Sequence, residues 1–423
     1  MRCPALLRSF RAASGVAGAW MAVCVLPGCV TTVDSLGYDR MSSDELGPLT
    51  GPSEYPNAFR DVLGKTDEEI AAKIEDSFEQ LFYGDRYEET VYYPVPGTEQ
   101  AYIWDDYHNS VRSEGIGLGM IITVELDKRD EFDRIWRYAK STLQLKSGPG
   151  QGYLMSWCDV PGGTAVVCFD PFGLQQVAMA LFFAHGRWGS DTGTIDYGMD
   201  AISLLEVMRH KEALNGGVAS GVTNTFDPTT KLVYDYPHVS AADVTRPSIE
   251  MPAYYELWAQ AMRDPFWSEA AASARTHWQE AAHPSTGLIP VRTHFDGTPV
   301  LNWDYFGSEA YRTQLSIALD HVWFGVDPWQ VEEADRLLGF FSKLGIDKYG
   351  AVFKINGAML SATPESALIF MNGVTGLIAT NDDRAAYIEA VWTTPPATGE
   401  TRYFSRLLHM LSLLTLSGQF RVY

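Results

Sequence analysis

Cysteine is scarce in this chain of 423 residues, which has only five. Three of them lie in the N-terminal segment, at Cys3, Cys24 and Cys29, so the rest of the chain contains only Cys158 and Cys168. Because no second pair of Cys or His stands at ligand spacing, the sequence predicts no metal site. The chain also lacks the GxSxG and HExxH motifs, which excludes the common serine-hydrolase and zinc-protease classes.

Positive charge is also limited, since 32 Lys and Arg stand against 53 Asp and Glu and give a formal net charge of −21. Such a protein repels phosphate backbones and anionic lipids, so nucleic acids and anionic membranes are poor partners. Aromatic residues are instead plentiful, at 13%, with 12 Trp and 21 Tyr. Aromatic rings suit the flat apolar faces of sugars, although they build protein cores as well.

Residues 1–28 have the pattern of a bacterial signal peptide, with arginines ahead of an apolar run that ends near residue 26. The run leads into Leu-Pro-Gly-Cys, which resembles the lipobox of bacterial lipoproteins and predicts lipidation of Cys29. The alternative is a conventionally cleaved signal in which Cys29 is incidental. We therefore expect an exported protein, lipid-anchored to a bacterial membrane or else periplasmic or secreted. Apart from that anchor we expect no membrane contact, because no later stretch approaches the roughly 20 apolar residues of a spanning helix.

Residues 29–56 contain scattered Ser, Gly, Pro and Asp without a periodic apolar pattern, so we expect a tether. From residue 57 onward the chain has the pattern of nearly continuous helix. The first helix is expected at residues 67–82, where Thr66 and Glu69 form a capping box. Its buried face is expected to consist of Ile70, Ile74, Phe78, Leu81 and Phe82.

Two kinds of helix then alternate along the expected domain, residues 57–423. Helices that are apolar nearly all round, and so buried, are expected at residues 114–126, 173–186, 250–263, 309–323 and 365–378. Helices with a charged face, and so on the outside, are expected at residues 130–144, 197–210, 266–282, 328–344 and 382–392. With residues 67–82 and 403–416 the helices number about twelve, which predicts a single all-α domain, an (α/α)6 toroid of six inner and six outer helices. The rival is an irregular helical bundle or solenoid, but no fixed-period repeat is visible.

Cys158 and Cys168 flank a turn-forming stretch at residues 160–163, which is expected to fold the segment back into a hairpin. An exported protein meets an oxidising compartment, so a disulfide bond between the two is one possibility. Two buried thiols are the other.

The sequence Ser113-Glu114-Gly115 opens the first strongly apolar helix, in which glycine recurs at three alternate positions. A ligand could approach a carboxyl group closely at such a place, which favours a site at Glu114. The alternative is that Glu114 caps the helix and the glycines allow tight helix packing. The run GIGLG lacks the GxGxxG spacing and has no strand before it, so we reject a dinucleotide-binding loop.

The same segment, SEGIGLGM with the preceding Asp106, Asn109 and Arg112 and the following ELDKRDEFDRIWRYAK, resembles the signature of glycoside hydrolase family 8. It is most similar to the branch that releases xylose from the reducing end of xylo-oligosaccharides. Further similar blocks follow in order over about residues 100–330: AMALFFAHGRWG, MPAYYELWAQA, TGLIPVRTHFDG and FGSEAYRTQLSIALD. The resemblance implies an (α/α)6 toroid, inversion of configuration at β-1,4-linked glycans, and Glu114 as general acid.

Inversion requires a second carboxylate about 6.5–9.5 Å away, which activates a water molecule. In the similar branch this base is an Asp in an SDAYR-like motif, and the resemblance places Glu309 at that position. Its extra methylene moves the carboxyl oxygens by about an ångström unless the backbone adjusts. Asp304, Asp170 and Glu250 are the alternative bases.

Two further departures from the family accompany Glu309. The family's Asp-Gly pair, whose Asp contacts the sugar, is replaced by Phe172-Gly173, with Asp170 two residues earlier. Glu250 stands in place of the His of a SYHLPAFYE-like block. The main alternative is therefore a catalytically silent glycan-binding lipoprotein of the same fold, and a lyase or an epimerase is a third.

The remaining candidates for contact with an oligo- or polysaccharide are aromatic and arginine side chains. We expect Arg312, three positions after Glu309, to share its helix face and to orient that carboxylate. No cofactor is implied, because two carboxyl groups are sufficient for glycoside hydrolysis. We expect the protein to act as a monomer. The candidate substrate-binding residues are Tyr107, Arg112, Trp157, Phe172, Trp303 and Arg312.

Overall fold

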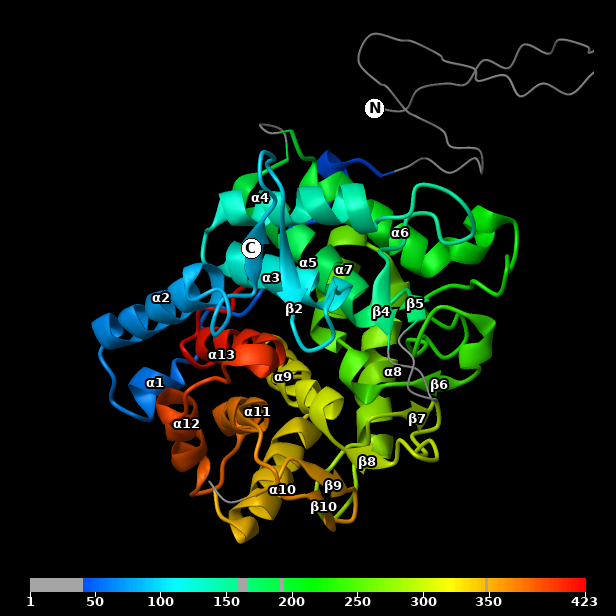
Figure 1. The fold of residues 1–423 in the computed structure, drawn as a ribbon. Coiled ribbons are helices and arrows are strands. Elements are labelled where there is room, and N and C mark those ends of the chain that lie inside the picture. The colour runs from blue at the N-terminus through cyan, green and yellow to red at the C-terminus, as the bar shows by residue number, and fades with distance from the viewer. Residues whose placement is uncertain (1–40, 159–165, 191–193, 347–348) are drawn as a thin grey trace, which may run out of the picture. The chain divides into compact units, whose positions relative to one another are not determined.

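Six helices whose residues are mostly buried form an inner ring (Figure 1). The computed structural model describes residues 41–158, 166–190, 194–346 and 349–423, and every structural statement below concerns these residues. In the first inner helix every residue except Glu114 is buried, because a helix that is apolar all round is stable only where protein surrounds it. The inner helices are α3 (Ser113–Glu125), α5 (Pro171–Trp188), α7 (Pro252–Met262), α9 (Ser308–Trp323), α11 (Ser366–Ile378) and α13 (Arg402–Leu416).

A second set of helices covers this ring from outside. Each packs on an inner helix, for example α4 on α3, α6 on α5 and α8 on α7. The outer helices are α2 (Asp67–Tyr83), α4 (Arg129–Tyr138), α6 (Tyr197–Asn215), α8 (Pro265–Ala281), α10 (Trp329–Leu344) and α12 (Arg384–Thr393). In α2 the predicted capping box joins Thr66 and Glu69, and the five predicted apolar residues are buried. The additional short helix α1 (Ala58–Asp61) contacts α12.

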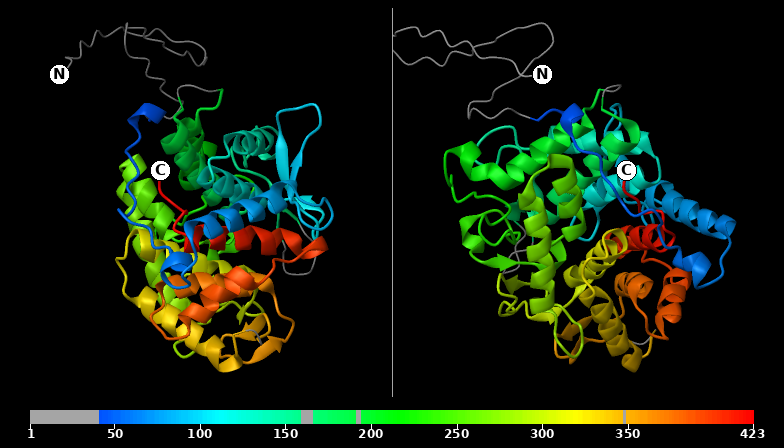
Figure 2. Two further views of the ribbon diagram at one scale, coloured as in Figure 1. Left: turned by 90° about the vertical axis from the view of Figure 1, so that its left-hand side faces the viewer. Right: turned by 180° about the vertical axis from the view of Figure 1, so that it is seen from behind.

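The ring closes because α13, the last helix, packs on both α3 and α11. It also packs on the outer helix α2, and Figure 2 shows the red α13 beside the blue α2. Five of the six inner helices line a shared cavity of about 20 Å³, room for about one water molecule. Each of these five helices contributes a lining residue, in chain order Leu118, Phe172, Tyr254, Arg312 and Leu408. The predicted (α/α)6 toroid is confirmed by this arrangement.

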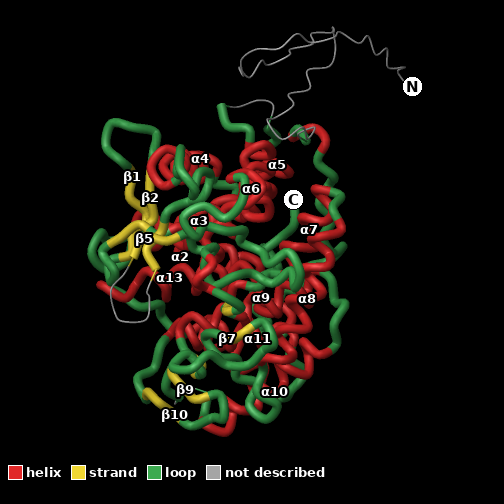
Figure 3. Tube along the Cα trace, turned by 90° about the vertical axis from the view of Figure 1, so that its right-hand side faces the viewer, coloured by secondary structure: helices red, strands yellow, loops and turns green. Residues whose placement is uncertain are grey.

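Short antiparallel strands lie in the connections that lead from an outer helix into the next inner helix. Because these connections end where the inner helices begin, the strands gather on one face of the toroid, which we name the strand face (Figures 1 and 3). They pair in the orders β1-β2-β3, β4-β5, β6-β7 and β10-β9-β8. The strands are β1 (Tyr92–Pro94), β2 (Ala101–Asp105), β3 (Ser110–Val111), β4 (Ser156–Cys158), β5 (Val166–Cys168), β6 (Val244–Thr245), β7 (Thr293–His294), β8 (Tyr305–Phe306), β9 (Val352–Lys354) and β10 (Met359–Ser361).

Residues 41–56 pack on the helical body, although the sequence predicts a tether there. The backbone NH of Gly47 donates to a carbonyl of α7 at 2.9 Å, and that of Thr50 donates to a glutamine side chain of the same helix at 2.7 Å. The structural unit begins at Met41. The domain start expected at residue 57 therefore lies too late in the chain, because a segment without helical period can still be held by backbone hydrogen bonds.

Several predictions concern parts of the chain that the structure does not describe. The signal peptide over residues 1–28 and the lipidation of Cys29 lie outside the described residues. The backbone places Cys158 and Cys168 on the paired strands β4 and β5, but their side chains and that of Trp157 are not described, so the disulfide stays a prediction. Within the described ranges, no helix is both long enough and apolar enough to cross a bilayer.

Candidate active site

The first turn of α3 presents Glu114 at the strand face, and the glycines that follow make room for neighbouring helices. A Cβ atom on Gly117 would lie 2.5 Å from the side chain of Gln176 in α5. A Cβ atom on Gly115 would lie 2.7 Å from the ring of Tyr403 in α13. These glycines therefore permit close helix packing, which is the structural alternative that the sequence left open.

Glu114 forms an ion pair with Arg312 of α9. The side chain of Glu114 is 18% exposed and that of Arg312 is 2% exposed, so the pair joins a reachable carboxylate to a buried cation. The guanidinium group of Arg312 also lies 4.0 Å from the centre of the Phe172 ring.

This geometry corrects two predictions. Arg312 was expected to orient Glu309 on its own helix, but it forms its ion pair with Glu114 of α3 and acts on Glu309 only through its charge, which lowers the pKa of that carboxyl group. Phe172 was expected to contact substrate, but it is 3% exposed and packs against Arg312 at the cavity shared by the inner helices. The buried Phe172 ring therefore supports the side chain of Arg312.

Glu309 lies in the first turn of α9 at the same face, and its side chain is 31% exposed. One carboxyl oxygen accepts a hydrogen bond from Nη1 of Arg246 at 3.2 Å. Burial would raise the pKa of this carboxyl, but the charges of Arg246, Arg312 and Arg292 together outweigh burial and lower the pKa to about 2. Glu309 is therefore charged at any pH well above 2.

Arg246 is the centre of an ion cluster that sequence reasoning missed. Besides Glu309, it forms ion pairs with Asp170 and Asp235, each at 2.8 Å. Asp235 pairs in turn with Arg292 at 2.8 Å. The four residues around Glu309 come from three connections between helices, where no periodic pattern marks them. Only the folded chain brings them together.

The structure disfavours two of the three alternative bases. Asp170 is 6% exposed, caps α5 by accepting a backbone NH at 3.1 Å, and pairs with Arg246, so it is not open to a sugar or a water molecule. Glu250 is fully buried and accepts hydrogen bonds from a backbone NH at 3.0 Å and a threonine hydroxyl at 3.2 Å. Burial raises the pKa of Glu250 to about 8, and its enclosed carboxyl group is not open to a sugar or a water molecule. Asp304 is exposed in the loop before β8 and stays an alternative.

The other candidate substrate-binding residues lie in different settings. Trp303 is partly exposed, and the buried guanidinium group of Arg292 lies 3.7 Å from the centre of its ring. The ring is also nearly parallel to that of Tyr305, at 23°. Tyr107 is 67% exposed in the turn between β2 and β3. Arg112 pairs with a buried aspartate of β2 at 3.2 Å and so supports this turn.

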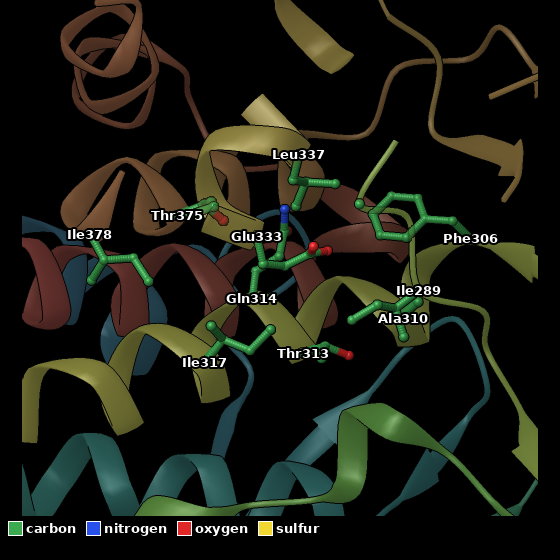
Figure 4. Close-up of a pocket in the computed structure, with 12 residues that line it drawn as sticks. Ile289, Phe306, Ala310, Thr313, Gln314, Ile317, Glu333, Leu337, Thr375 and Ile378 are labelled. Atoms are coloured by element: carbon green, nitrogen blue, oxygen red, sulfur yellow. The ribbon is translucent and has the colours of Figure 1, made fainter. Parts of the chain in front are cut away.

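A second cavity, also of about 20 Å³, lies between α9, α10 and α11 (Figure 4). Glu333, Gln314 and Thr313 line it together with apolar side chains, and burial raises the pKa of Glu333 to about 8. A space of this size holds about one water molecule, so it cannot admit a sugar. Among the described residues, no three His, Cys, Asp or Glu side chains are grouped to hold a metal ion. The strand face therefore remains the candidate site.

An (α/α)6 toroid that presents two partly exposed carboxyl groups at one face has the pair of groups that glycoside hydrolysis requires. The chain belongs to glycoside hydrolase family 8, because the model described as Glycosyl hydrolases family 8 matches residues 103–418. The resemblance seen in the sequence is thereby confirmed. The family consists of glycoside hydrolases, so the chain is assigned to this general class of enzyme.

Similar proteins include xylan-related members of this family. The chain is 36% identical over 380 residues to the reducing-end xylose-releasing exo-oligoxylanase Rex8A of Paenibacillus barcinonensis, covering 87% of this chain and 97% of the relative. A xylobiose complex from Teredinibacter turnerae aligns with a TM-score of 0.81 at 35% identity, covering 87% and 98% of the two chains. A mutant of Rex8A in complex with an arabinofuranosyl-xylotetraose aligns with a TM-score of 0.80 at 34% identity, covering 87% and 96%.

Proposed function

We propose that this protein hydrolyses β-linked oligosaccharides by inversion, with Glu114 as general acid and Glu309 as general base. The observation that carries the proposal is that the carboxyl groups of Glu114 and Glu309 occupy equivalent positions on two inner helices. Each stands in the first turn of an inner helix and is partly exposed, and Arg312 pairs with the first and lowers the pKa of the second. The names of similar proteins, an exo-oligoxylanase and complexes with xylobiose and a xylotetraose derivative, support xylo-oligosaccharides as first candidate substrates.

In this mechanism Glu114 donates a proton to the glycosidic oxygen, while Glu309 takes a proton from the water that attacks the anomeric carbon from the opposite face. The bond to the leaving oxygen breaks as the bond to water forms, so the configuration inverts. The pKa of about 2 keeps Glu309 ionised, which is the state that a general base requires. Glu114 needs a proton in the complex, so a bound sugar has to displace its carboxyl group from Arg312.

The decisive variant is Glu114→Gln, assayed on linear xylo-oligosaccharides with proton NMR of the newly formed anomer. We expect inversion in the wild type and a fall in kcat of about 10²–10⁴-fold in the variant. Glu332→Gln is the matched control, because Glu332 is an exposed first-turn glutamate of the outer helix α10. Retention of configuration, or full turnover by Glu114→Gln, would contradict the proposal.

A catalytically silent glycan-binding protein is the second candidate, and a specific observation favours it. Both carboxyl groups are held by arginines, and a base with a pKa of about 2 is a weak proton acceptor. This candidate predicts heat of binding with xylo-oligosaccharides in calorimetry but no change in their reducing ends over long incubation. Detection of turnover that depends on Glu114 would remove it.

We also propose that residues 1–28 direct export and that Cys29 is lipidated. The sequence Leu-Pro-Gly-Cys supports this proposal, because it resembles a lipobox. Cells fed a clickable fatty acid are expected to label the wild type and the control Cys24→Ala, but not Cys29→Ala. Absence of label in the wild type would favour the conventionally cleaved signal peptide, and equal labelling of Cys29→Ala would place the lipid on another residue.

A further inference from the structure

Arg246 is fixed in place by the backbone on both sides of it. It stands between β6 and the short helix η4 (Pro247–Ile249), and η4 packs on α9. Strand β6 pairs with β7, and the side chain of Arg246 is 9% exposed. The position of its guanidinium group is therefore set by the fold before any ligand arrives.

Two aspartates, Asp170 and Asp235, form ion pairs with this guanidinium group, and each is itself fixed by a further contact. Asp170 contacts it at 2.8 Å and is itself fixed as the N-cap of α5, where it accepts a backbone NH at 3.1 Å. Asp235 contacts it at 2.8 Å and is also paired with Arg292 at 2.8 Å. Because both aspartates are held elsewhere, Arg246 cannot turn away, and its Nη1 stays directed at Glu309, 3.2 Å away.

This cluster connects the sequence departures from the similar xylose-releasing branch. Glu309 replaces an Asp and is longer by one methylene, and a displacement of about 1 Å is enough to cost about 10²-fold in rate. Phe172 replaces the sugar-contacting Asp, while the nearby Asp170 binds Arg246. We infer that Arg246, held by Asp170 and Asp235, is a positioning residue for Glu309 that offsets the extra methylene. The inference rests on the proposed role of Glu309 as base.

Removal of the charge at Arg246 has a measurable consequence. It takes away the hydrogen-bond donor to Glu309 and leaves Asp170 beside it without a cation, while Asp235 keeps its ion pair with Arg292. The pKa of Glu309 should then rise from about 2 toward its ordinary value of 4.5. An arginine that held the fold without acting on Glu309 would leave this titration unchanged. The charged and titratable groups that face the Arg246 and Glu309 pair are Arg292, Arg312, Glu114, Tyr305, Asp170 and Asp235.

The test compares Arg246→Met and Arg246→Lys with the wild type by carbon NMR of protein labelled at the glutamate carboxyl. The Glu309 signal is assigned by its loss in Glu309→Gln. In the wild type this signal is expected to stay constant between about pH 4 and 7, whereas in Arg246→Met it should titrate within that window, a shift of about two pH units. Arg246→Lys keeps a charge but loses the planar fork, so its titration should stay low while kcat falls at least tenfold, as an order-of-magnitude expectation.

The NMR readout requires no turnover, so it separates this inference from the proposed function. A shifted titration in Arg246→Met supports the role of Arg246, and if no variant or wild type hydrolyses any glycan, only the hydrolase proposal fails. An unshifted Glu309 signal in folded Arg246→Met overturns the inference. If Arg246→Met does not fold, Arg246→Lys decides, because wild-type kcat in that variant overturns the inference as well. The matched control is Arg275→Lys, a buried arginine outside the site, which should leave the Glu309 titration unchanged.

Discussion

Helix α9 carries a buried ion cluster at each end, and the two clusters are built differently. At the C-terminal end, Asp320 is fully buried and accepts two hydrogen bonds from Arg275, at 2.7 and 2.8 Å. At the N-terminal end, Glu309 is 31% exposed and receives one contact from Arg246 at 3.2 Å. A neighbouring helix, α8, supplies the partner of Asp320, whereas a connection supplies that of Glu309. Asp320, which stabilises the fold, is therefore fully enclosed by protein. Glu309, which is proposed to react, is partly exposed.

The helix dipole increases this contrast. The partial positive charge at the N-terminus of α9 favours Glu309, and the partial negative charge at the C-terminus disfavours Asp320, each by about 0.3–1 kcal/mol. Asp320 therefore depends on its two hydrogen bonds from Arg275 for compensation. Glu309 has further support, since Arg312 and Arg292 also lower its pKa. Neutralising the two carboxylates should consequently have opposite effects on activity and stability.

The largest expected effect comes from the pair Glu309→Gln and Asp320→Asn. Glu309→Gln should lower kcat by about 10²–10⁴-fold and destabilise the fold by only about 1–2 kcal/mol, because Arg246 keeps two other carboxylates. Asp320→Asn should destabilise the fold by about 3–5 kcal/mol, because it breaks a fully buried pair, and should leave kcat of the folded protein unchanged. Urea unfolding and initial rates on the same samples measure both quantities.

The pH dependence checks the origin of the stability change. The folded pKa of Glu309 is depressed to about 2 from 4.5, so its contribution is present above about pH 4.5 and is lost as the pH falls through about 2. The stability difference between wild type and Glu309→Gln should therefore shrink on acidification. Equal losses of stability in both variants, or a loss of kcat in folded Asp320→Asn, would contradict the contrast between the two ends.

The fold could be predicted from the sequence because helical period is a local signal. The face of α2 from Ile70 to Phe82 and its capping box are set by residues three or four apart, and the structure has both as predicted. The alternation of wholly apolar and amphipathic helices then leaves an inner and an outer ring as the arrangement that buries both kinds. The packing of residues 41–56 on the helical body was not predicted, because it depends on backbone hydrogen bonds to α7. Such bonds leave no pattern in the side chains of the sequence.

The candidate site was predictable only where a motif marks it. Glu114 and Glu309 were found through resemblance, but Arg246, Asp235 and Arg292 lie in connections without a period. Arg312 was assigned to Glu309 from its spacing of three residues; its charge lowers the pKa of Glu309, but its ion pair is with Glu114. Spacing along a helix tells which residues share a face, but the partner that a long arginine side chain reaches depends on the neighbouring helix.

Glu250 provides a smaller test, because it is a buried carboxyl that belongs to neither end of α9. Burial raises its folded pKa to about 8 from 4.5, so the native protein keeps a proton that the unfolded chain releases between those values. Stability should therefore fall as pH rises through this window. Glu250→Gln removes this penalty, and its stability relative to the wild type should rise by about 3–4 kcal/mol from pH 5 to pH 8. A difference that is independent of pH in urea unfolding would show that Glu250 titrates normally.

The smallest expected effect concerns Trp303, whose ring contacts Arg292 of the ion cluster around Glu309. One face of its ring rests on the guanidinium group of Arg292 at 3.7 Å, and the side chain is partly exposed. A sugar stacked on the outer face would gain about 0.5–1.5 kcal/mol, so Trp303→Leu should raise KM about two- to tenfold with little change in kcat. Trp303→Phe keeps an aromatic face and should recover most of the affinity. A fall in kcat without a change in KM would instead indicate that the ring acts through Arg292 on the ion cluster, and Trp303 would then belong with the positioning residues.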